Sequence, residues 1–125
     1  MKRAIESQHA PKPVGPYSQA VEVGNFVFVS GQLGMDPKTG ALAEGVEAQA
    51  DLALRNISAI LEAGGFEMKD IVKVTIFLRD MKDFPRVNEV YARHFSEPYP
   101  ARACVEVSGL PKDALVEIEC IAAIE

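Results

Sequence analysis

The spacing of apolar residues changes once along this chain, and that change constrains the fold more than any other feature. From Val46 to Leu61, apolar residues recur at the spacing of an amphipathic helix, and Gly64-Gly65 then offers the backbone geometry at which helices end. The runs on either side are rich in β-branched residues and are bounded by Gly, Pro and Asn, a pattern typical of strands. A helix placed among strands in this way predicts an α+β domain.

The other elements follow from local signals. Gly24-Asn25 separates two strand-like runs and predicts an antiparallel hairpin. The predicted strands cover residues 18–23, 26–30, 71–78, 103–107 and 115–123. A second helix is predicted after Asp83, which can cap it, with an apolar stripe that extends to Phe95. Because no linker or repeat interrupts this series, we expect a single domain over residues 1–125, with two helices on one face of a single mixed or antiparallel sheet.

Composition argues against several classes of function. The chain has 125 residues, of which 48% are hydrophobic and 25% are charged, an ordinary globular balance. A net charge of −5 and the lack of a Lys or Arg block argue against nucleic-acid binding. No window approaches the roughly 18 apolar residues of a membrane helix, and the N-terminus lacks the apolar core of a signal peptide. We therefore expect a cytoplasmic protein without a membrane partner.

The cysteines and histidines do not form a recognisable metal or redox motif. Cys104 and Cys120 match neither a disulfide framework nor a CxxC pair, and both lie in predicted strands, where a free thiol usually packs as a small apolar residue. His9 and His94 have no neighbouring residues at metal-ligand spacing. The sequence therefore predicts no metal site.

The last two predicted strands carry charges where a half-buried strand usually places apolar side chains. Arg102 lies directly before the first of these strands, in the same alternating run, and Glu117 and Glu119 lie in the second. Burying an unpaired charge costs several kcal/mol, so a purely structural role would be unusual. Our hypothesis is that a guanidinium and a carboxylate share one sheet face. A planar cation there suits a ligand carboxylate, and a nearby Glu can handle a proton or a water.

The final strand also predicts an oligomer. One of its faces is fully apolar, with Val116, Ile118, Cys120 and Ala122, and should pack against the helices. The opposite face is half apolar and half acidic. Such a face is poorly suited to water but fits a subunit interface that contains a polar pocket.

Six segments spread along the chain point to one family. They are GPYSQA (15–20), SGQ (30–32), VN (87–88), PARACVEV (100–107), LPKD (110–113) and IE (118–119). In this order and spacing they resemble the reactive intermediate deaminase A (RidA) family, also called the YjgF family, over essentially the whole chain. The resemblance implies a chorismate-mutase-like fold and a homotrimer whose active sites lie in clefts between neighbouring subunits.

The same resemblance implies an activity and its residues. Family members hydrolyse 2-imino acids and their enamine tautomers, such as 2-aminoacrylate, 2-iminopropanoate and 2-iminobutanoate, to 2-keto acids and ammonia, without a cofactor. By family position, Arg102 binds the substrate carboxylate and Glu117 positions the attacking water. The further substrate-binding positions that carry over are Tyr17, Ser30, Gly31, Asn88 and Cys104, the last through its backbone.

Four other interpretations remain open. Arg102 could instead pair with Glu106 or Glu117 as a structural bridge at a subunit interface. The chain could also be a non-catalytic sensor of 2-keto acids or related carboxylates, or a protein-interaction module. A nuclease role, suggested for some relatives, fits the acidic balance poorly. Glu117 discriminates between enzyme and sensor, because a second anion repels an anionic ligand but suits a cationic imine.

Overall fold

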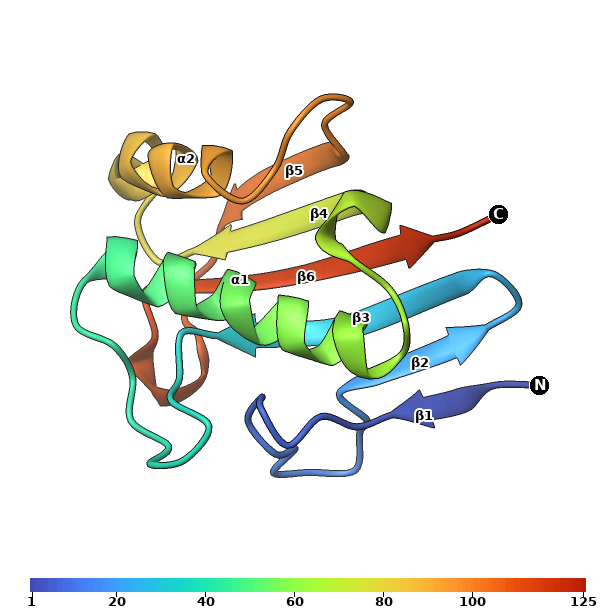
Figure 1. The fold of residues 1–125 in the computed structure, drawn as a ribbon. Helices are drawn as coiled ribbons and strands as arrows, with labels where there is room; N and C mark the ends of the chain where they lie inside the picture. The colour runs from blue at the N-terminus through green and yellow to red at the C-terminus, as the bar shows by residue number, and fades with distance from the viewer.

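Six strands form one mixed sheet in the computed structural model, which describes residues 1–125 (Figure 1). The strands are β1 (Arg3–Ile5), β2 (Ala20–Val23), β3 (Phe26–Leu33), β4 (Ile71–Leu78), β5 (Ala101–Glu106) and β6 (Val116–Ala123). Their spatial order is β1-β2-β3-β6-β4-β5. All neighbours are antiparallel except β4 and β5, which are parallel and are joined by a helical connection. The strand β5, which carries Arg102, is therefore one edge of the sheet.

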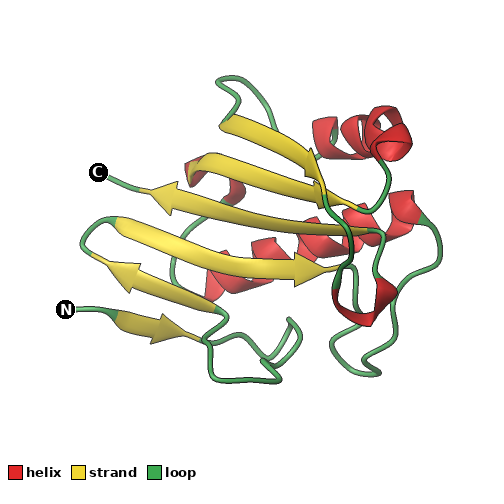
Figure 2. Ribbon diagram, turned by 180° about the vertical axis from the view of Figure 1, so that it is seen from behind, coloured by secondary structure: helices red, strands yellow, loops and turns green.

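Both helices lie on the same face of this sheet, as the sequence predicted. They are α1 (Val46–Ala63) and α2 (Phe84–Ala92), and Figure 1 shows both in front of the strands. Figure 2, seen from behind, leaves the strands in front of both helices. We call the sheet surface that α1 and α2 leave uncovered the open face.

The hydrophobic core lies between the helices and the sheet. On β6 the side chains of Val116, Ile118, Cys120 and Ala122 are buried, so the fully apolar set packs toward the helices as expected. From α1, Leu54, Ile57, Ile60 and Leu61 meet them and have no exposed surface. This burial on one helical stripe is what stabilises α1, because an isolated helix of its length is marginal in water.

The open face keeps apolar side chains in contact with solvent. Phe26 pairs with Ala123 across β3 and β6, and Phe28 pairs with Ile121. Phe26 and Phe28 are 47% and 45% exposed, and the centroids of their rings lie 6.3 Å apart. Glu117 and Glu119 share this face, because they alternate with the buried residues of β6. The open face is thus half apolar and half acidic, as the sequence predicted.

Several boundaries differ from the prediction for local reasons. The strand β1 was not predicted, because it has three residues and depends on pairing with β2. The strand β3 continues to Leu33 through an irregularity in its pairing with β6 between Val29 and Gln32. The helix α2 ends at Ala92, before Phe95.

Asp83 occupies the N-cap position of α2, as the sequence predicted, but its side chain does not cap the helix. Asp83 lies before the helix with helical backbone angles, and its side chain accepts no capping hydrogen bond. Its carboxylate instead accepts a hydrogen bond from Arg86 at 2.6 Å. Asp80 caps the preceding 3₁₀ turn by accepting a hydrogen bond from the Lys82 amide at 2.9 Å. The side-chain cap therefore belongs to the 3₁₀ turn that precedes α2.

Candidate active site

Five of the seven predicted site residues line two pockets on opposite faces of the sheet, and Ser30 and Cys104 line neither. Glu117 pairs with Leu33 and Phe77 on the open face, whereas Arg102 pairs with Val74, whose side chain is buried toward the helices. Side chains of paired residues point to the same face, so Arg102 and Glu117 point to opposite faces. The hypothesis that they share one face is therefore wrong within a single chain. The strand β4 separates β5 from β6, and its register sets this relation.

The Glu117 pocket has a volume of about 280 Å³. Its walls come from the loop before β2, from the end of β3 and from residues 111–112. The lining includes Pro11, Val14, Tyr17, Gly31, Leu33, Met35 and Pro111 beside Glu117. Two of the predicted substrate-binding residues, Tyr17 and Gly31, thus lie with Glu117. The pocket is an apolar hollow with a carboxylate in its wall.

Gly31 makes room for the Glu117 side chain. A Cβ atom at position 31 would collide with the Glu117 carboxylate, so only glycine permits the observed position of that group. The sequence predicted that Gly31 allows a ligand to approach the backbone closely. In the structure the group that approaches is Glu117 itself. The glycine therefore sets where the carboxylate lies.

The environment of Glu117 changes its acidity. Burial raises the pKa of the Glu117 carboxyl above its usual value, and the negative charge of Glu119 on the same face adds to the increase. A carboxylate with a raised pKa is a stronger base, which suits it to accept a proton from water. Glu119 itself is exposed.

Gln19 holds the loop that brings Tyr17 to the pocket. The buried Gln19 amide accepts a hydrogen bond from the Ser7 amide at 2.6 Å. Its Nε2 donates to the carbonyls of Ser7, Ala10 and Pro11 at 3.1, 3.3 and 2.8 Å. This role was not predicted from the sequence, although Gln19 lies in the GPYSQA segment. A glutamine at the start of a strand next to a proline-rich loop is the signal that could have indicated it.

Ser30 is engaged in the same loop rather than in either pocket. Its Oγ donates a hydrogen bond to the Ser18 carbonyl at 2.6 Å, and its amide donates to the Gln19 carbonyl at 2.9 Å. Both contacts tie β3 to the chain that leads into β2. In the single chain, Ser30 therefore contributes to the position of Tyr17 through the backbone.

Lys112 closes the pocket on the side of residues 111–112 and was also missed. Its backbone and that of Asp113 adopt left-handed conformations, with φ values of 58° and 56°. Such conformations cost about 1–3 kcal/mol each in residues other than glycine and concentrate at functional sites. The Lys112 Nζ donates to the Gly40 carbonyl at 2.9 Å and lies 3.5 Å from the Met35 sulfur. No local pattern in LPKD indicates this geometry.

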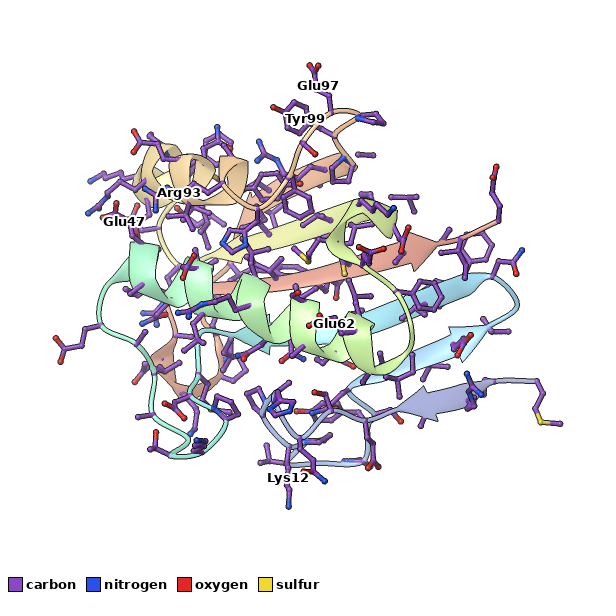
Figure 3. All side chains as sticks on the ribbon, viewed as in Figure 1. Lys12, Glu47, Glu62, Arg93, Glu97 and Tyr99 are labelled. Atoms are coloured by element: carbon purple, nitrogen blue, oxygen red, sulfur yellow. The ribbon has the colours of Figure 1, made fainter.

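The Arg102 pocket lies between α2 and the sheet edge, with a volume of about 500 Å³. Its lining comprises Asn88, Tyr91, Ala92, Tyr99, Pro100 and Arg102. The pocket shares no residue with the Glu117 pocket. In Figure 3, Lys12, at the Glu117 pocket, and Tyr99, at the Arg102 pocket, lie at opposite ends of the molecule.

The Arg102 guanidinium is held by α2 and has no carboxylate partner. Its Nη1 donates to the Asn88 Oδ1 at 2.6 Å, and its Cζ lies 4.7 Å from the Tyr91 ring centroid and 5.4 Å from that of Phe84. No ion pair of this chain includes Arg102. The Nε and Nη2 donors, which form one edge of the guanidinium, therefore remain available for a carboxylate.

A structural bridge within the chain is excluded by the same geometry. Glu106 shares the helix-facing side of β5 with Arg102, but its carboxylate accepts a hydrogen bond from the Met81 amide at 2.8 Å. Glu117 lies on the other face. Neither carboxylate neutralises the guanidinium inside one chain.

The two cysteines behave as packing residues. Cys104 lies two residues after Arg102 on the same face and packs against the core. Burial raises the pKa of its thiol, and Arg102 offsets part of that increase. Cys120 is buried, and the same cause raises its pKa to about 12. Both thiols are therefore protonated at neutral pH and poor nucleophiles.

The chain shows neither a cluster of metal ligands nor a membrane-spanning helix. Nowhere do three or more His, Cys, Asp or Glu side chains gather as metal ligands would. Neither helix combines the length and the apolar character that crossing a membrane requires.

Known proteins share both the sequence and the fold. The sequence matches the family described as endoribonuclease L-PSP over residues 7–124. A 2-iminobutanoate/2-iminopropanoate deaminase of Salmonella typhimurium is 50% identical over 125 residues, covering 98% of each chain. The crystal structure of RidA from an Antarctic Psychrobacter species has a TM-score of 0.95 and 52% identity, covering 98% of this chain and 99% of that chain. The structure of E. coli TdcF with bound serine has a TM-score of 0.94 and 45% identity, covering 98% and 99%. The chain therefore belongs to the endoribonuclease L-PSP family, the family of RidA and YjgF that its motifs predicted.

Proposed function

We propose that this protein hydrolyses 2-imino acids and their enamine tautomers, such as 2-iminopropanoate and 2-iminobutanoate, to 2-keto acids and ammonia. The observation that carries the proposal is the Arg102 guanidinium, which is fixed by Asn88 yet has no carboxylate partner. Half of the residues are identical to those of a relative named for this reaction. Imine hydrolysis also needs few catalytic groups, because a protonated imine is already electrophilic at carbon.

Each residue has a defined part in the proposed reaction. The free edge of Arg102 binds the substrate carboxylate through two parallel hydrogen bonds. Glu117 accepts a proton from the attacking water as the carbon–oxygen bond forms, giving a carbinolamine. Glu117 then gives that proton to the nitrogen. As the carbon–nitrogen bond breaks and ammonia leaves, Glu117 takes the hydroxyl proton, so that the keto group forms, and passes it on to ammonia or solvent. Tyr17 and Gly31 line the pocket in which this carbon lies.

One chain does not bring the two groups together, so the proposal requires an assembly. We infer a homotrimer in which the open face of one subunit meets the β5 edge and α2 of the next. Arg102 and Asn88 then come from one subunit, and Glu117, Tyr17 and Gly31 come from its neighbour. The exposed phenyl rings of Phe26 and Phe28 support this interface, because exposed apolar patches mark protein contacts.

A subunit-mixing experiment tests the activity and the shared site together. Arg102→Ala and Glu117→Ala chains are prepared separately, dissociated, mixed in equal amounts and reassembled. 2-Iminobutanoate is generated in place by an amino-acid oxidase, and its loss is followed. Each variant alone should be inactive, while random mixing should restore about a quarter of wild-type activity, because that fraction of interfaces combines both intact residues.

The possible failures are distinct. If wild-type protein does not outpace buffer, the deaminase proposal is wrong. If the wild type is active and the mixture is inert although mixed assemblies form, the shared site is wrong.

A sensor of small carboxylates is the second candidate. The Arg102 pocket is formed by residues of one chain and needs nothing from the Glu117 side to bind an anion. For a sensor, Glu117→Ala should leave 2-oxobutanoate binding, measured by calorimetry, unchanged, and wild-type protein should not turn over the imine. Turnover that Glu117→Ala abolishes would reject the sensor.

A further inference from the structure

One stripe of α2 makes all the side-chain contacts of Arg102 described above. Phe84, Asn88 and Tyr91 are spaced by four and three residues, which places them on one side of the helix. Asn88 accepts the hydrogen bond, and the two rings lie against the guanidinium. Arg102 itself is exposed on an edge strand. Its orientation therefore depends on the helix rather than on its own strand.

Tyr91 is not explained by packing alone. Its side chain is buried, at 6% exposed, and its ring stacks on Phe95 with centroids 4.4 Å apart. Its hydroxyl is buried without a hydrogen-bond partner. An unsatisfied buried hydroxyl is unfavourable, so phenylalanine would serve packing at least as well. The hydroxyl therefore gives no reason for a tyrosine here, and the part of the side chain with a role beyond core packing is the ring, whose centroid lies 4.7 Å from the Arg102 Cζ.

We propose that Tyr91 and Phe84 are positioning residues, which hold the Arg102 guanidinium so that its Nε–Nη2 edge is presented to a carboxylate. The inference rests on the proposed function of Arg102. An arginine side chain has many rotamers, and binding a ligand from a mobile side chain requires ordering it first. Cation–π contacts with two rings and the Asn88 bond order it in advance. The rings thus act on substrate affinity through Arg102, without contacting the reacting atoms.

The test compares ring removal with a matched loss of packing. Tyr91→Leu and Phe84→Leu remove one ring each, whereas Tyr91→Phe keeps the ring and removes the unpartnered hydroxyl. Val90→Ala is the control, because Val90 is buried on α2 but makes no contact with the guanidinium. For each variant we measure KM and kcat for 2-iminobutanoate, calorimetric affinity for 2-oxobutanoate, and Tm.

The expected result is a split between affinity and turnover. Each Leu variant should raise KM and the dissociation constant of 2-oxobutanoate by about 5–10-fold, with kcat within about 2-fold, as expected for the loss of one cation–π contact. Tyr91→Phe keeps the ring, so it should change both constants clearly less than Tyr91→Leu does. Val90→Ala should lower Tm with KM unchanged. Equal KM changes in Tyr91→Leu and Val90→Ala, or unchanged KM in both Leu variants, would overturn the proposal.

A direct measurement separates this inference from the activity. In protein labelled with ¹⁵N-arginine, NMR reports rotation about the Arg102 Nε–Cζ bond. Slow rotation in wild type and faster rotation in Phe84→Leu, with Val90→Ala unchanged, supports the positioning role even if no imine is hydrolysed. Equally slow rotation in all three proteins contradicts it. Phe84 is only partly buried, so this variant stays informative if Tyr91→Leu does not fold.

Discussion

The two pockets of this protein are built in different ways. The Arg102 pocket is local, because α2, the connection that follows it and the start of β5 supply all of its lining between Asn88 and Arg102. The Glu117 pocket draws on segments near residues 11–19, 31–35, 111–112 and 117, which only the folded sheet brings together. Under the proposed function, this difference corresponds to two separate roles. The local pocket fits binding of a carboxylate, and the composite pocket fits the placement of water and of the reacting carbon.

The largest expected effect tests the binding half. Arg102→Ala should lower kcat/KM for 2-iminobutanoate by roughly 10²–10³-fold, because losing one partner of a desolvated charge pair costs about 2–5 kcal/mol. Arg102→Lys should restore only part of this loss, since an ammonium group lacks the planar fork. The measurement is the initial rate of imine loss against substrate concentration. If Arg102→Ala hydrolysed the imine at the wild-type rate, the Arg102 pocket would not bind the substrate, and the proposed roles of the two pockets would be rejected.

The second effect tests the chemical half. Glu117→Gln should lower kcat by about 10²-fold or more, because positioned general bases contribute 10²–10⁴-fold to rates. It should leave the affinity for 2-oxobutanoate similar or slightly better, since a negative charge near an anion is removed. The two constants are measured by steady-state kinetics and calorimetry. A loss of affinity without a loss of kcat would instead make Glu117 a binding residue.

A smaller effect separates the site from the fold. Gly31→Ala places a Cβ against the end of the flexible Glu117 side chain, which can move aside. The variant should fold with nearly wild-type Tm but lose about 10-fold or more in kcat, because the carboxylate is displaced.

Gly34→Ala is the contrasting control for that experiment. A Cβ at position 34 would collide with the backbone of Gln49 in α1, which cannot move alone. It should therefore destabilise the protein by roughly 1–3 kcal/mol. If Gly31→Ala were the less stable of the two in thermal unfolding, Glu117 would be more tightly held than the structure indicates.

The smallest effect concerns stability and pH. Because the folded state raises the pKa of Glu117, ionising this group opposes folding once the pH exceeds the unfolded carboxyl value of about 4.3. Glu117→Gln removes that cost, so its Tm should exceed wild type by about 2–4 °C at pH 8 and match it at pH 4. The exposed Glu44 provides the control, since Glu44→Gln should barely change Tm at either pH. If the Tm advantage of Glu117→Gln over wild type grew toward pH 4, the pKa of Glu117 would be lowered by folding, not raised.

The sequence predicted those parts of the fold that depend on local periodicity. The apolar stripe of α1 correctly predicted which side of that helix is buried. The alternation in β6 correctly predicted which of its residues face the helices, because each pattern lies within one element. The prediction that Arg102 and Glu117 share one face was wrong. Alternation shows which residues of one strand point to the same face, but it does not relate two strands that have another strand between them. Only the pairing of Val74 with Arg102 and of Phe77 with Glu117 decides it.

The sequence also predicted only part of the candidate site. The family resemblance proposes Arg102 and Glu117 as functional, and the structure adds what surrounds them. The Phe84 and Tyr91 contacts, the Gln19 amide and the left-handed Lys112 all depend on tertiary contacts across the fold. Local propensity carries no information about such contacts, so sequence reasoning could not supply them.

The four hydrogen bonds of Gln19 have an evolutionary consequence. These bonds hold the start of the loop that carries Tyr17 through one side-chain amide. They do not involve the side chains of Lys12 and Val14, which lie at the rim of the Glu117 pocket. Mutations at those two exposed positions can reshape the mouth of the Glu117 pocket while the sheet stays intact. Descendants of this chain can thus change which substrates they accept without first sacrificing their fold.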